Sequence, residues 1–350
     1  MTLRTISLQD FRAYSQKKID FEKNITVLVG PNAIGKTTII EAIHLLATGD
    51  SFRAFKTDEM IKFGSEFARV TGKTDSDTIE ILLTNGLVQG KRVAPRIFSL
   101  NSVKKQKRSV VGAIQSVVFR PEDMRLIEGS PPRRRAFLDS PLKLLFPEYD
   151  RSLSTFDKAL RRRNKLLQEV REGGMSKTTL HYWDQTLLKH GTLIQKYRQR
   201  LVEFFTQVDF PVSFRGHYLP SILSESRQEQ YRAKEIAAGR SLIGPQKDDV
   251  SVELVIGGEF RDVGVFGSRG QQRLAVLWLK MCELAFLAKQ SDQTPLLLLD
   301  DILSELDREK REMVLSLTDT YQTILTTATK SIVDEVQSSV TARDATIILL

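Results

Sequence analysis

One eight-residue segment constrains the fold and chemistry of this chain more than any other. Gly30-Pro31-Asn32-Ala33-Ile34-Gly35-Lys36-Thr37 fits the pattern G-x-x-x-x-G-K-S/T. It follows the largely β-branched run 25–29, which predicts a buried strand, and it leads into apolar residues at helical spacing over 37–47. A strand, a glycine loop and a helix form the first half of a βαβ unit, so the sequence predicts an α/β domain.

The residue types in this loop indicate a phosphate site. Glycines let backbone N–H groups curl around phosphate oxygens, and the following helix points its positive end at the same anion. We expect Lys36 to reach the β- and γ-phosphates of a nucleotide and the Thr37 hydroxyl to ligate Mg²⁺. The predicted nucleotide-binding residues here are Gly30, Pro31, Asn32, Ala33, Ile34, Gly35, Lys36, Thr37 and Thr38.

Such a loop needs a second acidic contact for the metal, placed at the end of a buried strand. The aliphatic run 296–299 predicts that strand, and Asp300 and Asp301 follow it directly. We expect Asp300 to hold Mg²⁺ and Asp301 to orient or deprotonate an attacking water, so Lys36 and Asp301 are the predicted catalytic residues. The alternative is that both aspartates merely cap the next helix.

Two further motifs accompany these. Ser268-Arg269-Gly270-Gln271-Gln272 precedes a long predicted helix, and Ser304-Glu305-Leu306-Asp307 follows the aspartate pair. In this order the four motifs resemble those of the ABC-type ATPases, in which two subunits join head to tail and the signature of one closes over the nucleotide of the other. The resemblance implies that Ser268, Gly270, Gln271 and Asp307 also contact ATP, and that ATP drives formation of a homodimer.

More local matches narrow the resemblance to the RecF family, in the DNA-repair branch of the ABC-type ATPases. They lie at 8–12, 51–53, 119–124, 129–139, 159–164, 244–249 and 268–271, and so extend over nearly the whole chain. The resemblance implies a protein that binds DNA at gaps or single-/double-strand junctions with weak, DNA-stimulated ATP hydrolysis. It also implies action with RecR and RecO in DNA repair, replication restart and SOS induction.

Three positions depart from the expected pattern. Asp301 stands where most ABC-type ATPases place Glu, and Thr326 and Thr327 stand where a switch His is expected; both departures suggest slow hydrolysis. Gln246 replaces a His usual in RecF proteins, which leaves the role of the loop 244–249 open. A nucleotide-sensing scaffold therefore remains an alternative, distinguished by a turnover assay with DNA. A transporter ATPase subunit and a P-loop kinase are further alternatives, which permease binding and kinetics without a dimer would favour.

The net charge of +9 is concentrated in one part of the chain. Residues 91–135 hold 12 basic and 3 acidic side chains, whereas residues 1–90 are neutral and residues 201–350 carry −6. A localised positive field favours a polyanion partner, and DNA is the partner that the resemblance implies. The predicted DNA contacts are Lys104, Lys105, Lys107, Arg108, Arg133, Arg134 and Arg135. The alternative is that Arg133–Arg135 pair with internal acids or nucleotide phosphates.

The middle of the chain predicts a different architecture. Apolar residues recur at spacings of three and four on both sides of Gly173-Gly174, which is typical of an antiparallel helical hairpin. We expect Asn164 and His190 to be polar residues of its seam. The predicted organisation is therefore an ATPase head made of 1–140 and 241–350, interrupted by a helical arm over 141–240.

The remaining observations exclude several classes of protein. No apolar run approaches the roughly 20 residues of a membrane span, and no secretory signal is visible, so we expect a cytoplasmic protein. The single cysteine, Cys282, lies in an apolar helical stretch and is expected to be a buried, inert thiol. Phe11 and Arg12 could contribute to adenine binding, with packing an equal alternative.

Overall fold

The computed structural model describes residues 2–22, 24–291, 293–338 and 345–350, and the chain forms two compact units. Unit 1 comprises residues 1–123 and 283–350, and unit 2 comprises residues 124–282. The second unit begins before the predicted arm 141–240 and extends past it, because a helix before the arm and a sheet after it pack within the same unit.

Unit 1 contains a five-stranded parallel sheet in the order β10-β14-β15-β3-β16. Its strands are β3 (Ile25–Val29), β10 (Ser116–Phe119), β14 (Leu296–Asp300), β15 (Thr323–Thr327) and β16 (Ala345–Leu349). β10, β14 and β15 are buried along their whole length, as expected for parallel strands covered on both faces. The predicted strands 25–29 and 296–299 are confirmed.

A six-stranded antiparallel sheet, in the order β2-β1-β4-β5-β8-β9, completes the strand content of unit 1 together with a short hairpin. The strands are β1 (Leu3–Phe11), β2 (Tyr14–Asp20), β4 (Phe67–Thr74), β5 (Thr78–Thr84), β8 (Arg96–Leu100) and β9 (Val103–Lys105), with β6 (Leu87–Val88) and β7 (Lys91–Arg92) in the hairpin. β1 alternates buried and half-exposed residues, so one face of this sheet covers a core.

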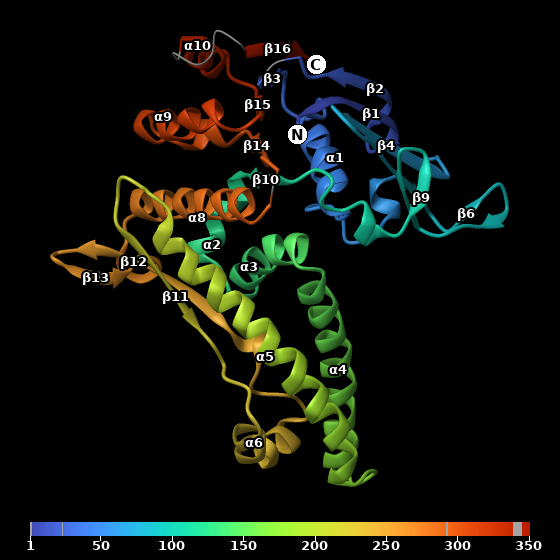
Figure 1. Ribbon diagram of the computed structural model, residues 1–350, viewed down its shortest axis with the longest axis vertical. Coiled ribbons are helices and arrows are strands. Elements are labelled where there is room, and N and C mark those ends of the chain that lie inside the picture. Colours follow the sequence, from blue (N-terminus) through green and yellow to red (C-terminus); the bar gives the residue numbers. More distant parts are fainter. Residues whose placement is uncertain (1, 23, 292, 339–344) are drawn as a thin grey trace. The chain divides into compact units, whose positions relative to one another are not determined.

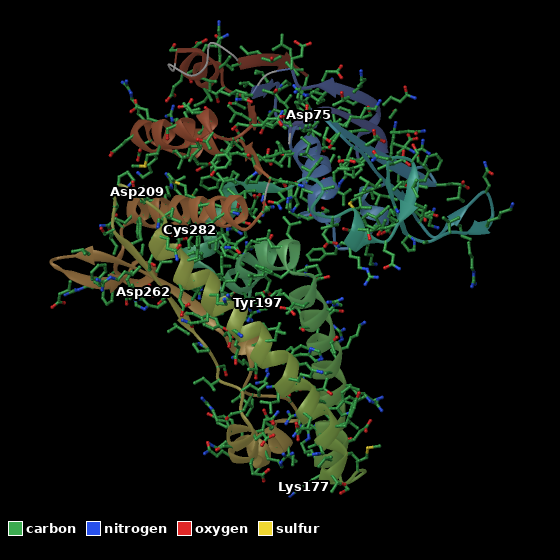
Figure 2. All side chains as sticks on the ribbon, viewed as in Figure 1. Asp75, Lys177, Tyr197, Asp209, Asp262 and Cys282 are labelled. Atoms are coloured by element: carbon green, nitrogen blue, oxygen red, sulfur yellow. The ribbon has the colours of Figure 1, made fainter. Side chains whose placement is uncertain are left out.

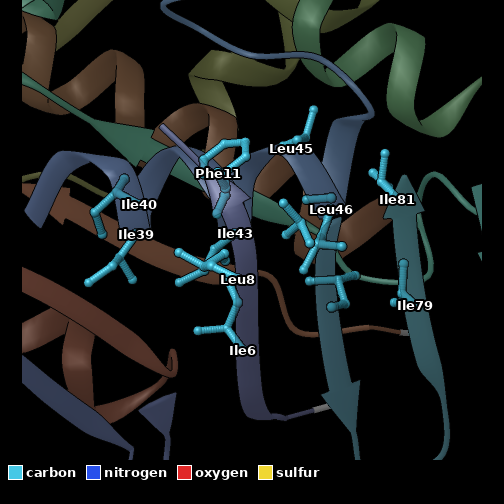
Figure 3. Close-up of a cluster of buried hydrophobic side chains, with 14 of the residues drawn as sticks. Ile6, Leu8, Phe11, Ile39, Ile40, Ile43, Leu45, Leu46, Ile79 and Ile81 are labelled. Atoms are coloured by element: carbon cyan, nitrogen blue, oxygen red, sulfur yellow. The ribbon is translucent and has the colours of Figure 1, made fainter. Parts of the chain in front are cut away.

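That core is organised around the helix α1 (Lys36–Thr48), which follows the glycine loop. Ten of its thirteen residues are buried, so the helix is enclosed by other elements on nearly every side. Figure 3 shows its side chains beside Leu8 of β1, and Ile6, Ile79 and Ile81 belong to the same buried cluster. Burying each of these side chains contributes roughly 1.5–3 kcal/mol, so the core fixes the helix that begins at Lys36.

The remaining helices of unit 1 are α9 (Arg308–Ser316) and α10 (Lys330–Ser338), and the long helix α8 (Arg269–Gln290) begins in unit 2 and ends in unit 1. Cys282 is buried on α8, and burial raises the pKa of its thiol, which confirms the expected inert cysteine. No helix in the described ranges is long and apolar enough to cross a membrane.

Unit 2 contains the predicted helical hairpin. Its arms are α4 (Pro147–Arg171) and α5 (His181–Phe204), which run side by side in Figure 1. Gly173 provides the left-handed backbone, φ 79°, that the turn requires, and Lys177 lies in the same connection (Figure 2). Leu166 and Leu167 pack with Leu180 near this turn. The hairpin is therefore confirmed.

The other elements of unit 2 lie along the hairpin, from its base to its turn. They are α2 (Arg125–Glu128), α3 (Pro131–Leu145), α6 (Glu225–Ala238), α7 (Val263–Phe266) and a three-stranded sheet of β11 (Phe214–Leu219), β12 (Asp249–Ile256) and β13 (Glu259–Asp262). The ring of Trp278 on α8 is 2% exposed and contacts Phe205 and Phe214, with ring centroids 5.6 and 5.3 Å away.

Buried ion pairs hold the hairpin to its neighbours. Arg163 of α4 is 1% exposed and donates to Asp184 at 2.7 Å, and its guanidinium lies 2.7 Å from Glu235 of α6. The prediction for His190 is confirmed, since it lies 3.2 Å from the Ser152 hydroxyl of the other arm, whereas Asn164 accepts from the N–H and hydroxyl of Ser241, which follows the hairpin in sequence. The seam is thus more charged than its apolar spacing predicts.

Candidate functional site

The carboxyl ends of three adjacent parallel strands bring the predicted phosphate site of unit 1 together. β15 lies between β14 and β3, with Asp300 opposite Thr326 and Val29 opposite Thr327. The Gly30 N–H donates to the Thr327 carbonyl at 3.3 Å. Because loops that leave the carboxyl ends of parallel strands share one edge of the sheet, this edge is where such folds bind ligands.

The glycine loop has the backbone geometry that a phosphate cradle needs. Ala33 and Gly35 have left-handed φ values of 68° and 110°, which turn successive N–H groups in different directions. A Cβ on Gly35 would lie 2.6 Å from the hydroxyl of Tyr14, a β2 residue whose hydroxyl donates to the Ile34 carbonyl at 3.2 Å. Gly35 is therefore required both for its backbone conformation and for the space that Tyr14 occupies.

Lys36 closes the mouth of this loop with its own ammonium group. Its Nζ donates to the Gly30 carbonyl at 2.6 Å and to the Pro31 carbonyl at 3.0 Å, and the residue is 7% exposed. The cation is thus held over the loop backbone, next to the N-terminus of α1. A positive charge placed at a helix N-terminus has no favourable partner in the helix dipole, so this arrangement suits an anionic ligand.

Thr37 and Asp300 lie together, as the metal hypothesis requires. The Thr37 hydroxyl donates to Asp300 Oδ1 at 3.0 Å, and the Thr326 hydroxyl donates to the same oxygen at 2.9 Å. Mg²⁺ takes oxygen ligands and is commonly held by one or two protein groups together with substrate phosphates and water. The residues present fit this pattern, and within the described ranges no group of three or more His, Cys, Asp or Glu forms a separate metal site.

Asp301 occupies a strained position directly after the strand. Its φ of 53° is left-handed, a conformation that Asp tolerates better than most residues, and its N–H donates to the Thr326 hydroxyl at 3.0 Å. Burial raises the pKa of Asp301, while the nearby Lys36 ammonium lowers it. Burial also raises the pKa of Asp300, against the hydrogen bonds from Thr326 and Thr37. Raised carboxylate pKa values are typical of functional sites.

Thr326 is a site residue whose role the sequence did not reveal. It was noted as the place of a missing histidine, yet its hydroxyl joins Asp300 and Asp301 into one hydrogen-bonded unit. Tyr14 was also missed, because nothing in the local sequence indicates that β2 lies against the glycine loop. The one available signal was that a hydroxyl residue, Thr326, stands at the end of a strand near the Asp300-Asp301 pair.

Two of the motifs expected to contact ATP, at residues 268–272 and 304–307, cap helices in the structure. Ser268 and Gln271 form a reciprocal capping box at the start of α8: the Ser268 N–H donates to Gln271 Oε1 at 2.8 Å, and Ser268 Oγ accepts from the Gln271 N–H at 3.3 Å. Gly270 is exposed between them. Asp307 in unit 1 caps α9 by accepting from the Lys310 N–H at 3.1 Å. These residues lie in different units.

Arg12 and Phe11 have structural partners. Phe11 is fully buried, and the Arg12 guanidinium donates to both carboxylate oxygens of Glu41, at 3.0 and 2.6 Å. Glu41 is 0% exposed on α1 and also accepts from the Ser51 hydroxyl at 2.5 Å, with Arg53 at 3.7 Å. This arrangement favours the packing alternative for both residues over adenine contact.

The predicted DNA-contact residues divide into exposed and paired groups. Lys104 and Lys105 on β9 and Arg108 after it are exposed in unit 1, and Arg133 is exposed in unit 2. Lys107 instead pairs with Asp50 at 2.6 Å. Lys104, Lys105 and Arg108 are therefore exposed to an anionic partner, whereas Lys107 is partly engaged.

Arg134 and Arg135 are half-buried and face their own unit. Arg134 donates to both oxygens of Asp249, at 2.7 and 2.8 Å, and to the Gly129 carbonyl at 2.6 Å. Arg135 donates to the Asp248 carbonyl at 2.7 Å. Arg134 thus corresponds to the alternative in which these arginines meet internal acids, whereas Arg135 meets a backbone carbonyl.

The loop Gly244–Asp249 has a clear structural task. Asp248 is 0% exposed and accepts from Arg198 at 3.0 Å, from Gln195 at 2.9 Å and from the Ser221 N–H at 2.8 Å, and also from the Tyr218 hydroxyl. Arg198 in turn donates to both oxygens of Asp139. The loop thus ties α5 to α3 and to the sheet of unit 2.

Known proteins are similar to this chain in sequence and in fold. The chain matches the family described as RecF/RecN/SMC N terminal domain over residues 2–346. It is 33% identical to the DNA replication and repair protein RecF of Herpetosiphon aurantiacus, covering 90% of each chain, and 34% identical to that of Gloeobacter violaceus, covering 95% of this chain and 94% of that one.

Two solved structures extend the comparison to three dimensions. One is described as the recombination mediator protein RecF-ATPrS in the RecFOR pathway and matches with a TM-score of 0.82 at 29% identity, covering 94% of this chain and 93% of that one. The corresponding RecF-ATP structure matches with a TM-score of 0.80 at 29% identity, covering 94% and 92%. The fold is thus that of an ABC-type ATPase head with a helical-hairpin arm, and the chain belongs to the RecF family.

Proposed function

We propose that this protein is an ATP-dependent recombination mediator that dimerises on ATP, binds DNA at gaps or single-/double-strand junctions and acts with RecR and RecO in repair, replication restart and SOS induction. The observation that carries the proposal is the cluster of Lys36, Thr37, Asp300 and Asp301 at one sheet edge. The similar solved structures described as RecF-ATPrS and RecF-ATP support it.

The residues of this edge have distinct tasks in the proposed ATP site. The N–H groups of residues 30–38 hold the phosphates, and Lys36 exchanges its two carbonyl partners for β- and γ-phosphate oxygens. Thr37 and Asp300 would hold Mg²⁺, which when bound would neutralise phosphate charge. Asp301, supported by Ser304 and Thr326, orients the attacking water and accepts its proton.

Hydrolysis is expected to be slow. Asp301 has a shorter side chain than the Glu of most ABC-type ATPases, and its left-handed backbone limits how far the carboxylate can extend. Thr326, at the position of the switch histidine, is already committed to the two aspartates. The enzyme therefore spends most of its cycle in the ATP-bound state, which suits a gated DNA clamp.

Dimerisation requires residues of the second subunit. Ser268, Gly270, Gln271 and Asp307 are proposed to contact the nucleotide bound by the partner, with the Ser268 hydroxyl leaving its capping box to do so. The α8 N-terminus then directs its positive end at the γ-phosphate. DNA contacts the exposed residues Lys104, Lys105, Arg108 and Arg133, and the basic charge gives the electrostatic attraction.

Sizing chromatography with and without ATP tests the gate. Asp301→Asn should accumulate an ATP-bound dimer because hydrolysis is blocked, whereas Lys36→Ala should remain monomeric because the phosphates lose their cation. An Asp301→Asn protein that stays monomeric in ATP would contradict the gating proposal. Duplex binding measured against salt then tests the partner: the four proposed phosphate contacts would give a slope of log K against log salt of about −3.6 for each subunit that meets the duplex.

A further inference from the structure

The segment between α1 and β4 carries the two most exposed large apolar side chains among the described residues. Phe55 is 97% exposed and Phe63 is 103% exposed. Single exposed apolar residues are ordinary on protein surfaces. Two entire aromatic rings, only eight positions apart, are a larger exposure than packing explains. The sequence does not distinguish these two exposed rings from Phe52, a residue of the same segment whose ring is partly buried.

The backbone that carries the rings is anchored on both sides. Phe52 lies beneath the Arg120 guanidinium, 4.4 Å from its ring centre, and Met60 is fully buried. The Glu59 carbonyl accepts from Arg12 at 2.6 Å, and Ile61 pairs with Phe11 of β1. The rings therefore project from a fixed loop rather than from a flexible end.

Local hydrogen bonds direct both rings outward. The Phe55 N–H donates to the Glu59 carboxylate at 2.8 Å, which closes a compact turn from which the ring projects. Phe63 stands in a tight turn, where the Ser65 N–H donates to the Lys62 carbonyl at 3.0 Å and Gly64 has a φ of 86°. Turn positions normally hold polar residues, so a fully exposed Phe at this place points to a ligand that uses its face.

The charges of the segment favour one kind of ligand. The stretch 53–63 carries Arg53, Lys56 and Lys62; Arg53 and Lys56 are exposed, Arg53 lies 3.7 Å from Glu41, and Lys62 donates to the Ser15 hydroxyl. The acids of this stretch are the exposed Asp58 and Glu59, and Glu59 accepts from the Phe55 N–H. Aromatic faces on a stretch in which cations outnumber acids suit unpaired nucleotides, whose bases stack while their phosphates meet the cations. A duplex hides its base faces, and a protein partner would need a broader apolar patch.

We propose that Phe55 and Phe63, with Arg53, Lys56 and Lys62, form a stacking platform for the unpaired bases of single-stranded DNA. The platform rests on the proposed function, since it assumes a DNA ligand, and it adds the single-stranded part of a junction to the phosphate contacts proposed above. Phosphate contacts alone do not separate single strands from duplex, whereas stacking does.

Fluorescence anisotropy with the full chain and ATP tests the platform. The probes are a labelled oligothymidine strand and a labelled duplex of equal length. Phe55→Ala/Phe63→Ala should weaken single-strand binding by about 5- to 100-fold and leave duplex binding unchanged, since each stacked base is worth that order of affinity. Phe55→Tyr/Phe63→Tyr should retain binding. Tyr182→Ala is the matched control, because that ring is also exposed but lies on α5 in unit 2.

A second readout follows the stack directly. A strand that contains 2-aminopurine should lose fluorescence on binding to the wild type and keep it with the Ala variant, while ATP binding shows that the variant is folded. Unchanged single-strand affinity, or an equal loss on duplex, would overturn the platform. Loss of the ATP-dependent dimer would assign the rings to a self-interface and overturn it too. A wild type that binds neither DNA would overturn the proposed function, whereas ring-independent binding would overturn the platform alone.

Discussion

The chain contains two Asp-Asp pairs beside strands, and they have opposite surroundings. Asp248-Asp249 begins β12 in unit 2, where Arg198 donates to Asp248 and Arg134 donates to both oxygens of Asp249. Asp300-Asp301 ends β14 in unit 1, where the carboxylates accept from the hydroxyls of Thr37, Thr326 and Ser304. Arginines neutralise the carboxylates of this dipeptide in unit 2, whereas hydroxyls bind them in unit 1 and leave their charge for a cation.

The pKa values show what this difference means. Partial burial alone would raise the pKa of Asp249, but the hydrogen bonds from Arg134 lower it. Burial raises the pKa of both Asp300 and Asp301. The Asp249 carboxylate therefore stabilises the fold as an ion, whereas the charged form of Asp300 costs stability until a cation is supplied. The second behaviour is that of a binding site, and the first is that of a structural brace.

The largest expected effect is on the brace. Arg198→Met leaves Asp139 and Asp248 buried without their shared guanidinium, and breaking such a pair destabilises a protein by about 3–5 kcal/mol. Urea unfolding at neutral pH measures the loss. Arg200→Met, at an exposed position on the same helix, is the matched control. Equal stability of the two variants would remove the distinction between the pairs.

Arg134→Gln should cost less, about 1.5–3 kcal/mol, because it removes charged hydrogen bonds at a half-buried site. Since the folded pKa of Asp249 is lowered, its contribution is fully present above the unfolded value of 3.8 and is lost as the pH falls through the folded pKa. Unfolding measured from pH 7 to acid should therefore show a shallower decline in the variant. Arg133→Gln, which is exposed, should keep the wild-type decline.

Asp300→Asn should act in the opposite direction. Because the folded pKa of Asp300 is raised, wild-type stability falls as the pH rises from 3.8 through the folded pKa, and Asn removes that decline. The nucleotide-free variant should therefore be slightly more stable at pH 7, by less than Arg134→Gln loses. Mg²⁺-dependent ATP binding should weaken at the same time. A destabilised variant would show that Asp300, too, is a brace.

The smallest effect concerns the exposed cations. Lys104→Gln and Lys105→Gln should each reduce the slope of log K against log salt for duplex binding by about 0.9, the value for one phosphate contact. Lys107→Gln should change it less, because Lys107 pairs with Asp50. Arg134→Gln should leave the slope unchanged if the protein stays folded. A slope that depends on Arg134 would mean that the brace also meets DNA.

The sequence predicted the ATP site better than the braces, and distance along the chain explains why. Residues 30–37 adopt their shape from local backbone preferences, and Asp300 needs only a parallel neighbour to reach Thr37. Arg198 meets Asp139 and Asp248 from 59 and 50 residues away, on elements that no local pattern joins. The charge count of residues 91–135 therefore led to Arg134 as a DNA contact although it is paired internally with Asp249.

The surface aromatics show the opposite failure. Periodicity predicts which apolar residues of a helix or strand are buried, but the segment after α1 is neither. Phe52, Phe55 and Phe63 were equivalent in sequence, and hydrogen bonds specific to the loop decide which ring packs and which is exposed. Thr326 was likewise visible only as a missing histidine.

The buried Glu41 limits which substitutions this protein can accept during evolution. Its carboxylate is fully buried and is held by Arg12 and by Ser51 and Arg53, from two separate stretches of chain. A mutation at any one of the four leaves a buried charge or donor unmatched, so single steps are selected against and paired steps are favoured. Among homologues, these four positions should therefore vary together, and the link between the nucleotide-binding helix and the aromatic loop should be inherited as a unit.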